Sequence, residues 1–118
     1  MGRVISQNWT VETLLDYDFR YGDHKIEIIG AARMEYNYDE NESNIEVYFP
    51  RVETTPELAL RIRVDGNEMD RDSALFEAIA DYLVEVLQNE ITTTKTDLTN
   101  DDFADYDNDL LEELLDEL

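Results

Sequence analysis

The chain has 118 residues, of which 42% are hydrophobic and 10% aromatic, so its composition is that of one domain with a hydrophobic core rather than a disordered chain. Its formal net charge of −21 at pH 7 opposes direct binding to nucleic acid, because such a surface repels phosphates. It contains no cysteine, which excludes disulfides, thiol catalysis and cysteine-bound zinc.

The first residues predict neither a secretion signal nor a membrane span. The stretch MGRVISQNWT lacks a basic region followed by an apolar run, and no window of the sequence approaches about 18 apolar residues. We therefore expect a cytoplasmic protein that contacts no membrane. Residues 9–15, WTVETLL, predict a short helix with Thr10 as its N-cap and Trp9 packed against Leu14.

Three strands are predicted next, because apolar and polar residues alternate along the chain. Residues 25–39 predict a long, half-buried strand, and a polar turn leads to a second strand at residues 44–52. Residues 57–64 predict a third strand, which the turn Asp65-Gly66-Asn67 follows. Consecutive strands joined by turns favour an antiparallel meander.

A long helix is predicted near residues 72–90, capped by Asp72 or Ser73. Its apolar residues recur at helical spacing and would cover the sheet: Leu75, Ile79, Tyr82, Leu83, Val86 and Leu87. Its outer side carries Glu77, Asp81 and Glu85 at four-residue steps. Like charges at this spacing destabilise a helix by roughly 0.2–0.5 kcal/mol per pair.

The C-terminal segment, DDFADYDNDLLEELLDEL at residues 101–118, predicts an acidic amphipathic helix after a polar connector at residues 92–100. Thr99 and Asp102 would cap it. Its apolar stripe would dock on the domain or pair with a second copy in a homodimer: Phe103, Tyr106, Leu110, Leu111, Leu114, Leu115 and Leu118.

The predicted architecture is thus a single α+β domain over residues 1–118. Residues 1–91 form its core, in which a three-stranded antiparallel sheet is packed by one long helix and preceded by a short N-terminal helix. The acidic C-terminal helix completes the fold.

The charge is concentrated in the second half of the chain. Residues 1–64 hold 12 acids and 7 bases, whereas residues 65–118 hold 18 acids and 2 bases. An 18-residue helix at the C-terminus would be about 27 Å long, so its nine acids would supply one charge per ~3 Å, close to the ~3.4 Å per phosphate of a DNA strand. This density predicts a surface for a basic groove, formed by Asp105, Asp109, Glu112 and Asp116 with Asp81 and Glu85 of the long helix beside them.

A calcium site is the alternative use of this segment. Asp105, Asp107 and Asp109 match the first three ligand positions of an EF-hand loop, and Asp116 matches the twelfth. Leu110, however, stands where that loop requires glycine. We therefore expect no calcium and no other cofactor.

Catalysis has little support in the sequence. His24 is the only histidine, and its place at the start of a strand predicts a solvent-exposed residue rather than a general base. Neither a nucleophile motif nor a glycine-rich phosphate loop is present. We expect that the protein is not an enzyme.

In charge, size and placement of acids, the chain resembles the DNA-mimic inhibitors, which are phage and mobile-element proteins that offer carboxylates where phosphates would lie. The resemblance implies an inhibitor of the anti-restriction or anti-CRISPR type, which acts in a bacterial host cell if a phage encodes it. Its partner would be a basic nucleic-acid-binding protein, such as a nuclease or a defence effector. Two alternatives stay open: an acidic immunity protein or antitoxin of a nuclease toxin, and a small acidic secretion chaperone.

Overall fold

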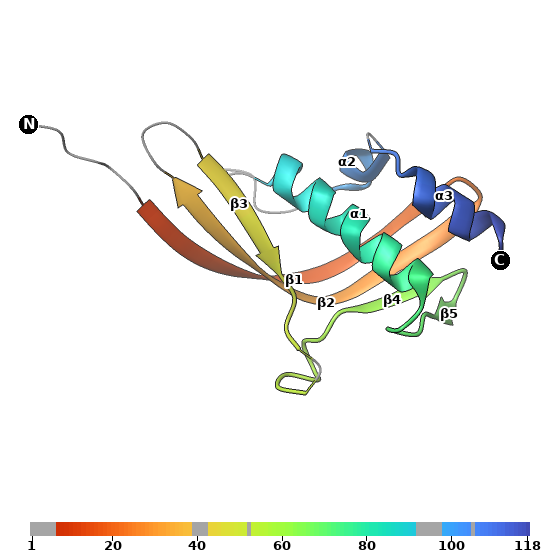
Figure 1. Cartoon of the computed structure of the whole chain (residues 1–118), viewed down its shortest axis with the longest axis horizontal. Coiled ribbons are helices and arrows are strands. Elements are labelled where there is room, and N and C mark those ends of the chain that lie inside the picture. The colour runs from red at the N-terminus through yellow and green to blue at the C-terminus, as the bar shows by residue number, and fades with distance from the viewer. Residues whose placement is uncertain (1–6, 39–42, 52, 92–97, 105) are drawn as a thin grey trace, which may run out of the picture.

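The computed structural model describes residues 7–38, 43–51, 53–91, 98–104 and 106–118. Within these residues the chain forms an α+β fold, in which a five-stranded antiparallel sheet carries three helices on one face (Figure 1). The predicted α+β class and antiparallel sheet are confirmed, but the prediction of three strands is wrong.

A long hairpin is the largest part of the sheet. Strand β1 (Gln7–Tyr21) pairs with strand β2 (His24–Tyr38) over its whole length. The tight turn between them contains Gly22, whose φ of 60° suits glycine. The register places alternate residues of both strands on the face that the helices cover.

The helix predicted for residues 9–15 is wrong, because these residues lie in β1. The pair Leu14 and Leu15 fits a helical stripe, but the strand places the two on opposite faces of the sheet. Leu14 is 75% exposed, whereas Leu15 is buried under the helices. The alternation continues at every second position through Leu15, Tyr17, Phe19 and Tyr21, and pairing along the whole strand outweighs the short helical pattern.

β2 is the central strand of the sheet. Strand β3 (Ser43–Tyr48) pairs with its second half, and strand β4 (Arg61–Val64) pairs with its first half. Both lie on the side of β2 opposite β1, so the predicted meander is wrong. Strand β5 (Asn67–Glu68) pairs with β4 through the predicted turn, where Asp65 and Gly66 have the positive φ values of a type I′ hairpin.

At Gly30 the chain between β3 and β4 crosses close to β2. Gly30 has a φ of 140°, which residues with a side chain rarely adopt. A Cβ at this position would lie 2.9 Å from the Ala59 carbonyl oxygen and 3.0 Å from the Leu60 Cα. The Ala31 N–H donates a hydrogen bond to the Leu58 carbonyl at 3.0 Å. The strand predicted for residues 57–64 is accordingly limited to β4.

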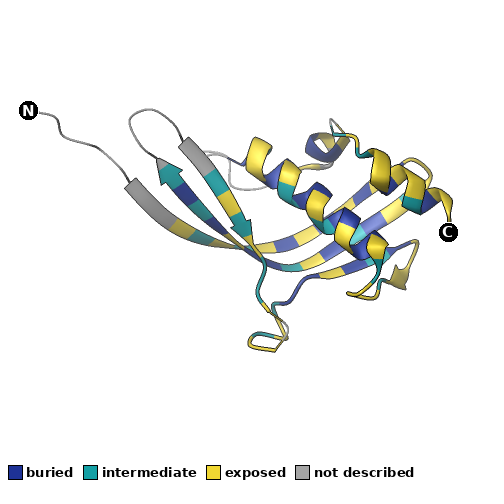
Figure 2. Ribbon diagram, viewed as in Figure 1, coloured by how far each residue is buried: buried dark blue, intermediate teal, exposed yellow. Residues whose placement is uncertain are grey.

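The long helix is confirmed as α1 (Ala74–Glu90), with Ser73 as its N-cap. The Ser73 side chain accepts a hydrogen bond from the Phe76 N–H at 3.1 Å. Figure 2 shows that buried and exposed residues alternate along the strands beneath this helix. One hydrophobic cluster joins the sheet to the helices, and its fully buried members include Ile26, Ile28, Met34, Ile62, Ile79, Tyr82, Leu83, Leu87, Phe103 and Leu111.

The C-terminal segment is not one helix, as predicted, but two. Helix α2 (Asn100–Ala104) and helix α3 (Asp109–Asp116) are separate, because residues 106–108 belong to neither helix. Asn108 has an extended backbone (φ −141°, ψ 112°), and its side chain accepts a hydrogen bond from the Leu111 N–H at 3.0 Å. A residue that caps a new helix cannot lie inside a longer one. The predicted line of nine carboxylates along a single 27 Å helix is therefore wrong.

Candidate functional site

The helix layer, which we define as α1, α2 and α3, contains no basic residue. α1 buries its apolar stripe on the sheet and exposes Glu77, Asp81 and Glu85 to solvent. These are the positions that helical spacing predicts. The structure therefore places two of the predicted site residues, Asp81 and Glu85, on the outer face of α1.

α2 is fixed to the sheet and to α1 by aromatic packing and hydrogen bonds. The Phe103 ring stacks on Phe19 of β1 with a centroid distance of 4.1 Å. The buried Tyr82 hydroxyl lies within hydrogen-bonding distance of the Phe103 carbonyl and, at 3.1 Å, of the Tyr106 carbonyl. The predicted Thr99 and Asp102 cap is confirmed, because the Asp102 carboxylate accepts from the Thr99 N–H at 2.7 Å.

The link between α2 and α3 is held by Tyr21, the last residue of β1. The Tyr21 hydroxyl donates to the Asn108 carbonyl at 3.2 Å and accepts from the Asn108 N–H at 2.9 Å. This pair of bonds fixes the residue that caps α3. Sequence reasoning missed the role of Asn108, although an Asn directly before the run Asp109-Leu110-Leu111 is a typical N-cap signal.

α3 presents carboxylates on its solvent side and two of its leucines toward the core. Leu111 and Leu115 are buried, so the predicted docking of this stripe on the domain is confirmed for these two residues. Its eight residues rise about 12 Å and carry four acids, or one charge per ~3 Å: Asp109, Glu112, Glu113 and Asp116.

The structure brings the predicted site residues into two groups. Glu112 and Asp116 border a depression of about 330 Å³ on the side of α3 that faces the turn between β1 and β2. Asp81 and Glu85 lie on α1, which packs against α3 (Figure 1). Asp109 begins α3 and is exposed, and Asp105 lies outside the described residues.

Asp107 is an acid of this surface that the prediction omitted. Burial raises the pKa of Tyr21, the hydrogen bond to Asn108 lowers it, and nearby carboxylates raise it again: Glu112, Asp107 and Asp109. Burial also raises the pKa of Tyr82, with further contributions from Tyr21, Asp107 and Glu85. Asp107 therefore lies near both hydroxyls, at the link between α2 and α3.

The ion pairs between described residues lie on the sheet and its turns, not in the helix layer. The Arg61 guanidinium contacts the Glu68 carboxylate at 2.6 Å, and the Lys25 ammonium lies 3.5 Å from Asp18. In the part of the chain that the structure describes, Asp81, Glu85 and the α3 acids form no ion pair. These carboxylates are therefore available to a basic partner.

His24 is half-buried and forms a structural contact. Its Nδ1 lies 2.7 Å from an Asp65 carboxylate oxygen, and the Lys25 N–H donates to the other oxygen at 3.0 Å. The hydrogen bond from His24 and then that from Lys25 lower the pKa of Asp65. The predicted solvent-exposed His24 is thus corrected to a residue that joins β2 to the turn between β4 and β5.

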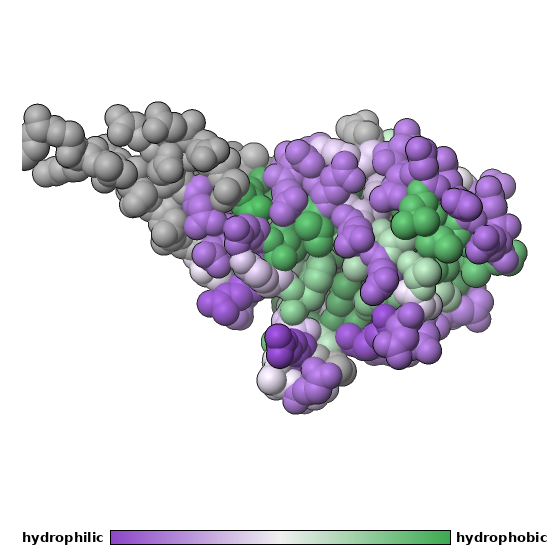
Figure 3. Space-filling model, viewed as in Figure 1, coloured by the Kyte–Doolittle hydropathy of each residue, from purple (hydrophilic) through white to green (hydrophobic). Residues whose placement is uncertain are grey.

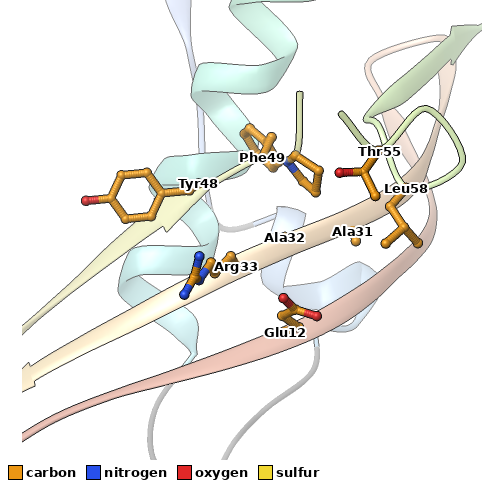
Figure 4. A pocket seen from close by; sticks show the side chains of 9 residues that line it. Glu12, Ala31, Ala32, Arg33, Tyr48, Phe49, Thr55 and Leu58 are labelled. Atoms are coloured by element: carbon orange, nitrogen blue, oxygen red, sulfur yellow. The ribbon is translucent and has the colours of Figure 1, made fainter. Parts of the chain in front are cut away.

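A second depression, of about 270 Å³, lies on the opposite, open face of the sheet (Figure 4). Ala31 and Leu58 belong to its apolar lining, and the charged residues Glu12 and Arg33 lie across from each other on β1 and β2. Opposite charges at adjacent positions offset each other, so this depression offers no concentrated charge to a ligand.

Neither a metal site nor a membrane-crossing helix occurs among the described residues. No group of three or more of their His, Asp or Glu side chains is arranged to hold a metal ion. None of the described helices has both the length and the apolar character to cross a bilayer. No protein-family model, curated protein or solved structure matches this chain.

Proposed function

We propose that this protein is an acidic inhibitor that occupies the basic groove of a nucleic-acid-binding protein, where its carboxylates take the place of phosphates. The observation that carries the proposal is the separation of charge. The helix layer holds exposed acids without a basic residue of its own, while the ion pairs between described residues lie on the sheet.

The helix dipole favours Asp109 and Glu112 in the first turn of α3, but the placement of other acids is unfavourable for the isolated fold. Glu113, Asp116 and Glu117 lie at the C-terminal end of α3, where the helix dipole disfavours each negative charge by roughly 0.3–1 kcal/mol. Glu77, Asp81 and Glu85 repel one another along α1. A surface that reduces stability, and that would attract a basic groove from a distance, favours a role in binding.

The same surface suits an immunity protein or antitoxin whose target is a nuclease toxin. Both proposals predict that the partner is a basic nucleic-acid-binding protein. They differ only in whether that partner is a toxin made beside this protein or a defence enzyme of a host cell.

Neutralisation of the helix layer tests the proposal. A variant with Asp81→Asn, Glu85→Gln, Asp109→Asn, Glu112→Gln and Asp116→Asn removes five negative charges while it keeps side-chain shape. We expect its affinity for the target to fall at least about 100-fold, because roughly 1 kcal/mol lost at only three of the five charges already amounts to that factor. Isothermal calorimetry with a target recovered on the immobilised protein measures this change.

The matched control removes five charges from other regions: Glu12→Gln, Asp16→Asn, Glu27→Gln, Glu53→Gln and Glu57→Gln. Its net charge is the same as that of the helix-layer variant. We expect its affinity to remain within about fivefold of the wild type, because only long-range attraction is lost. Equal losses in the two variants would show that no defined surface is used.

A further inference from the structure

α3 carries more exposed apolar surface than its docking on the core explains. Leu111 and Leu115 are buried, but Leu110 is 56% exposed and Leu118 is 66% exposed. Leu114 lies between them in the sequence and is only partly buried. The three residues are spaced by four, so they form a second leucine stripe along the flank of the helix, beside the buried Leu111 and Leu115.

This outer leucine stripe (Leu110, Leu114 and Leu118) lies among the carboxylates of the helix layer. Glu113 and Glu117 are its neighbours on the solvent side of α3. Glu112 and Asp116 face the other way, toward the turn between β1 and β2. Figure 3 shows apolar surface beside hydrophilic side chains over this part of the molecule.

The position of Leu118 is defined although it follows the end of α3. The Leu118 N–H donates to the Leu115 carbonyl at 3.2 Å, and the Glu117 N–H donates to the Leu114 carbonyl at 3.3 Å. These bonds tighten the last turn of the helix and continue its course. The stripe therefore extends from Leu110 to Leu118 as one surface.

Substitution of phosphates requires carboxylates and does not require exposed leucines. A contiguous apolar surface within a strongly charged one is typical of a protein-binding site, because its burial contributes affinity that charges alone do not supply. Leucines spaced by four residues match the anchors with which helices recognise one another. A second copy of this chain fits poorly, since it would bring the acids of two α3 helices together.

We propose that the outer leucine stripe is a docking site for a basic amphipathic helix of the target protein. The apolar side chains of that helix contact Leu110, Leu114 and Leu118, and its lysines and arginines contact the surrounding carboxylates. The inference rests on the proposed function in one respect, which is that the target is a basic protein.

Two synthetic peptides with the same number of lysines test the proposal. One has about 18 residues in which leucine and lysine alternate at helical spacing, and the other has serine in place of every leucine. Fluorescence anisotropy measures the binding of each peptide at about 0.15 M NaCl. We expect the leucine peptide to bind the wild-type protein about 30-fold more tightly than the serine peptide.

Substitutions on the stripe should remove this preference. In the variant Leu110→Gln with Leu118→Gln, both changed residues are exposed, and glutamine keeps good helix propensity. We expect the ratio of the two affinities to fall below about threefold. The matched control, Leu14→Thr with Ile29→Thr, changes exposed apolar residues on the open face of the sheet and should keep the full ratio.

The possible failures point to different causes. If neither peptide binds at about 0.05 M NaCl, the proposed function itself is wrong, because the helix layer does not attract a basic partner. If both peptides bind with equal affinity, or the stripe variant keeps the preference, the docking stripe is wrong while the electrostatic proposal stands. A wild-type dimer in light scattering that becomes a monomer in the stripe variant would assign the stripe to a second copy and overturn the proposal.

Discussion

Tyr82 joins the long helix to the C-terminal segment that carries much of the acidic surface. Its side chain is fully buried, and its hydroxyl lies within hydrogen-bonding distance of the Phe103 and Tyr106 carbonyls. Its ring also packs edge-on against Tyr21, which in turn holds Asn108 at the start of α3. Residues from β1, α1 and α2 thus position the α3 acids together.

We predict that Tyr82→Phe lowers the free energy of unfolding by about 1–3 kcal/mol, because it leaves buried carbonyls without their donor. Urea unfolding followed by circular dichroism measures the change. Tyr48→Phe is the control, since Tyr48 is 47% exposed and should shift stability by less than about 0.5 kcal/mol. Equal effects of the two substitutions would show that the Tyr82 bonds contribute little.

Stability should also fall at alkaline pH. Burial, followed by nearby negative groups, raises the pKa of Tyr82 above the ordinary value of about 10, so the folded state keeps this hydroxyl protonated where the unfolded chain loses the proton. The stabilisation that the protonated Tyr82 hydroxyl contributes is complete below about pH 10 and is lost as pH rises from there toward the folded-state pKa. Urea midpoints from about pH 8 to pH 11 should decrease, with a shallower decrease in Tyr82→Phe. If the urea midpoints of the wild type and of Tyr82→Phe decrease in parallel as pH rises, Tyr82 is not the cause of the loss.

Among the secondary-structure elements, the arrangement of the strands depends on Gly30, because it allows residues 58–60 to run against the central strand, β2. The positive φ and the short distances to the Ala59 and Leu60 backbones leave no room for a Cβ. β2 can therefore be flanked by β3 along one half and by β4 along the other.

We predict that Gly30→Ala destabilises the protein by about 2 kcal/mol or more, since it combines backbone strain with overpacking against main-chain atoms. Gly22→Ala is a suitable comparison, because that glycine also has a positive φ, but a Cβ added there would meet no atom within 4 Å. The Gly22 variant should lose only about 1 kcal/mol. Thermal melts of both variants provide the test, and a smaller loss at Gly30 than at Gly22 would refute it.

The elements that could be predicted from sequence are those whose pattern is long and local. α1 is a clear case, because Ser73 and a long apolar stripe indicate the helix without tertiary information. β1 was missed although Leu15, Tyr17, Phe19 and Tyr21 alternate with polar residues in the sequence, because the pair Leu14 and Leu15 suggests a helix locally. The division of the C-terminal segment depends on a distant contact, between Tyr21 and Asn108.

The candidate site, too, could be predicted only where a local sequence pattern determines which residues are exposed. Exposure of Asp81 and Glu85 follows from helical spacing alone. Which way Glu112 and Asp116 face depends on how α3 docks beside the turn between β1 and β2, which sequence does not specify. Asp107 was missed because its nearness to both Tyr21 and Tyr82 arises only in the folded chain.

For the whole molecule, the dominant feature is a net charge of −21, with 18 of the 30 acids in residues 65–118, the part of the chain that contains the helix layer. Repulsion among these carboxylates lowers the stability of the folded state, and dissolved salt screens it. The proposed binding surface therefore contributes to the electrostatic cost of folding.

We predict that the melting temperature rises as NaCl increases from about 0.05 to about 0.5 M, because screening relieves this repulsion. The helix-layer variant with five neutralised acids should melt at a higher temperature than the wild type in low salt and should respond less to added salt. Differential scanning calorimetry measures both effects. A melting temperature that falls with salt would mean that attractive ion pairs dominate instead.

The proposed function is tested most directly by competition between this protein and nucleic acid for one target. Labelled DNA or RNA is bound to the target, the protein is titrated in, and fluorescence anisotropy records the release of the label. We predict complete release, a midpoint that rises in proportion to the nucleic-acid concentration, and little release by the helix-layer variant. A target that binds this protein and nucleic acid at the same time would contradict the proposal.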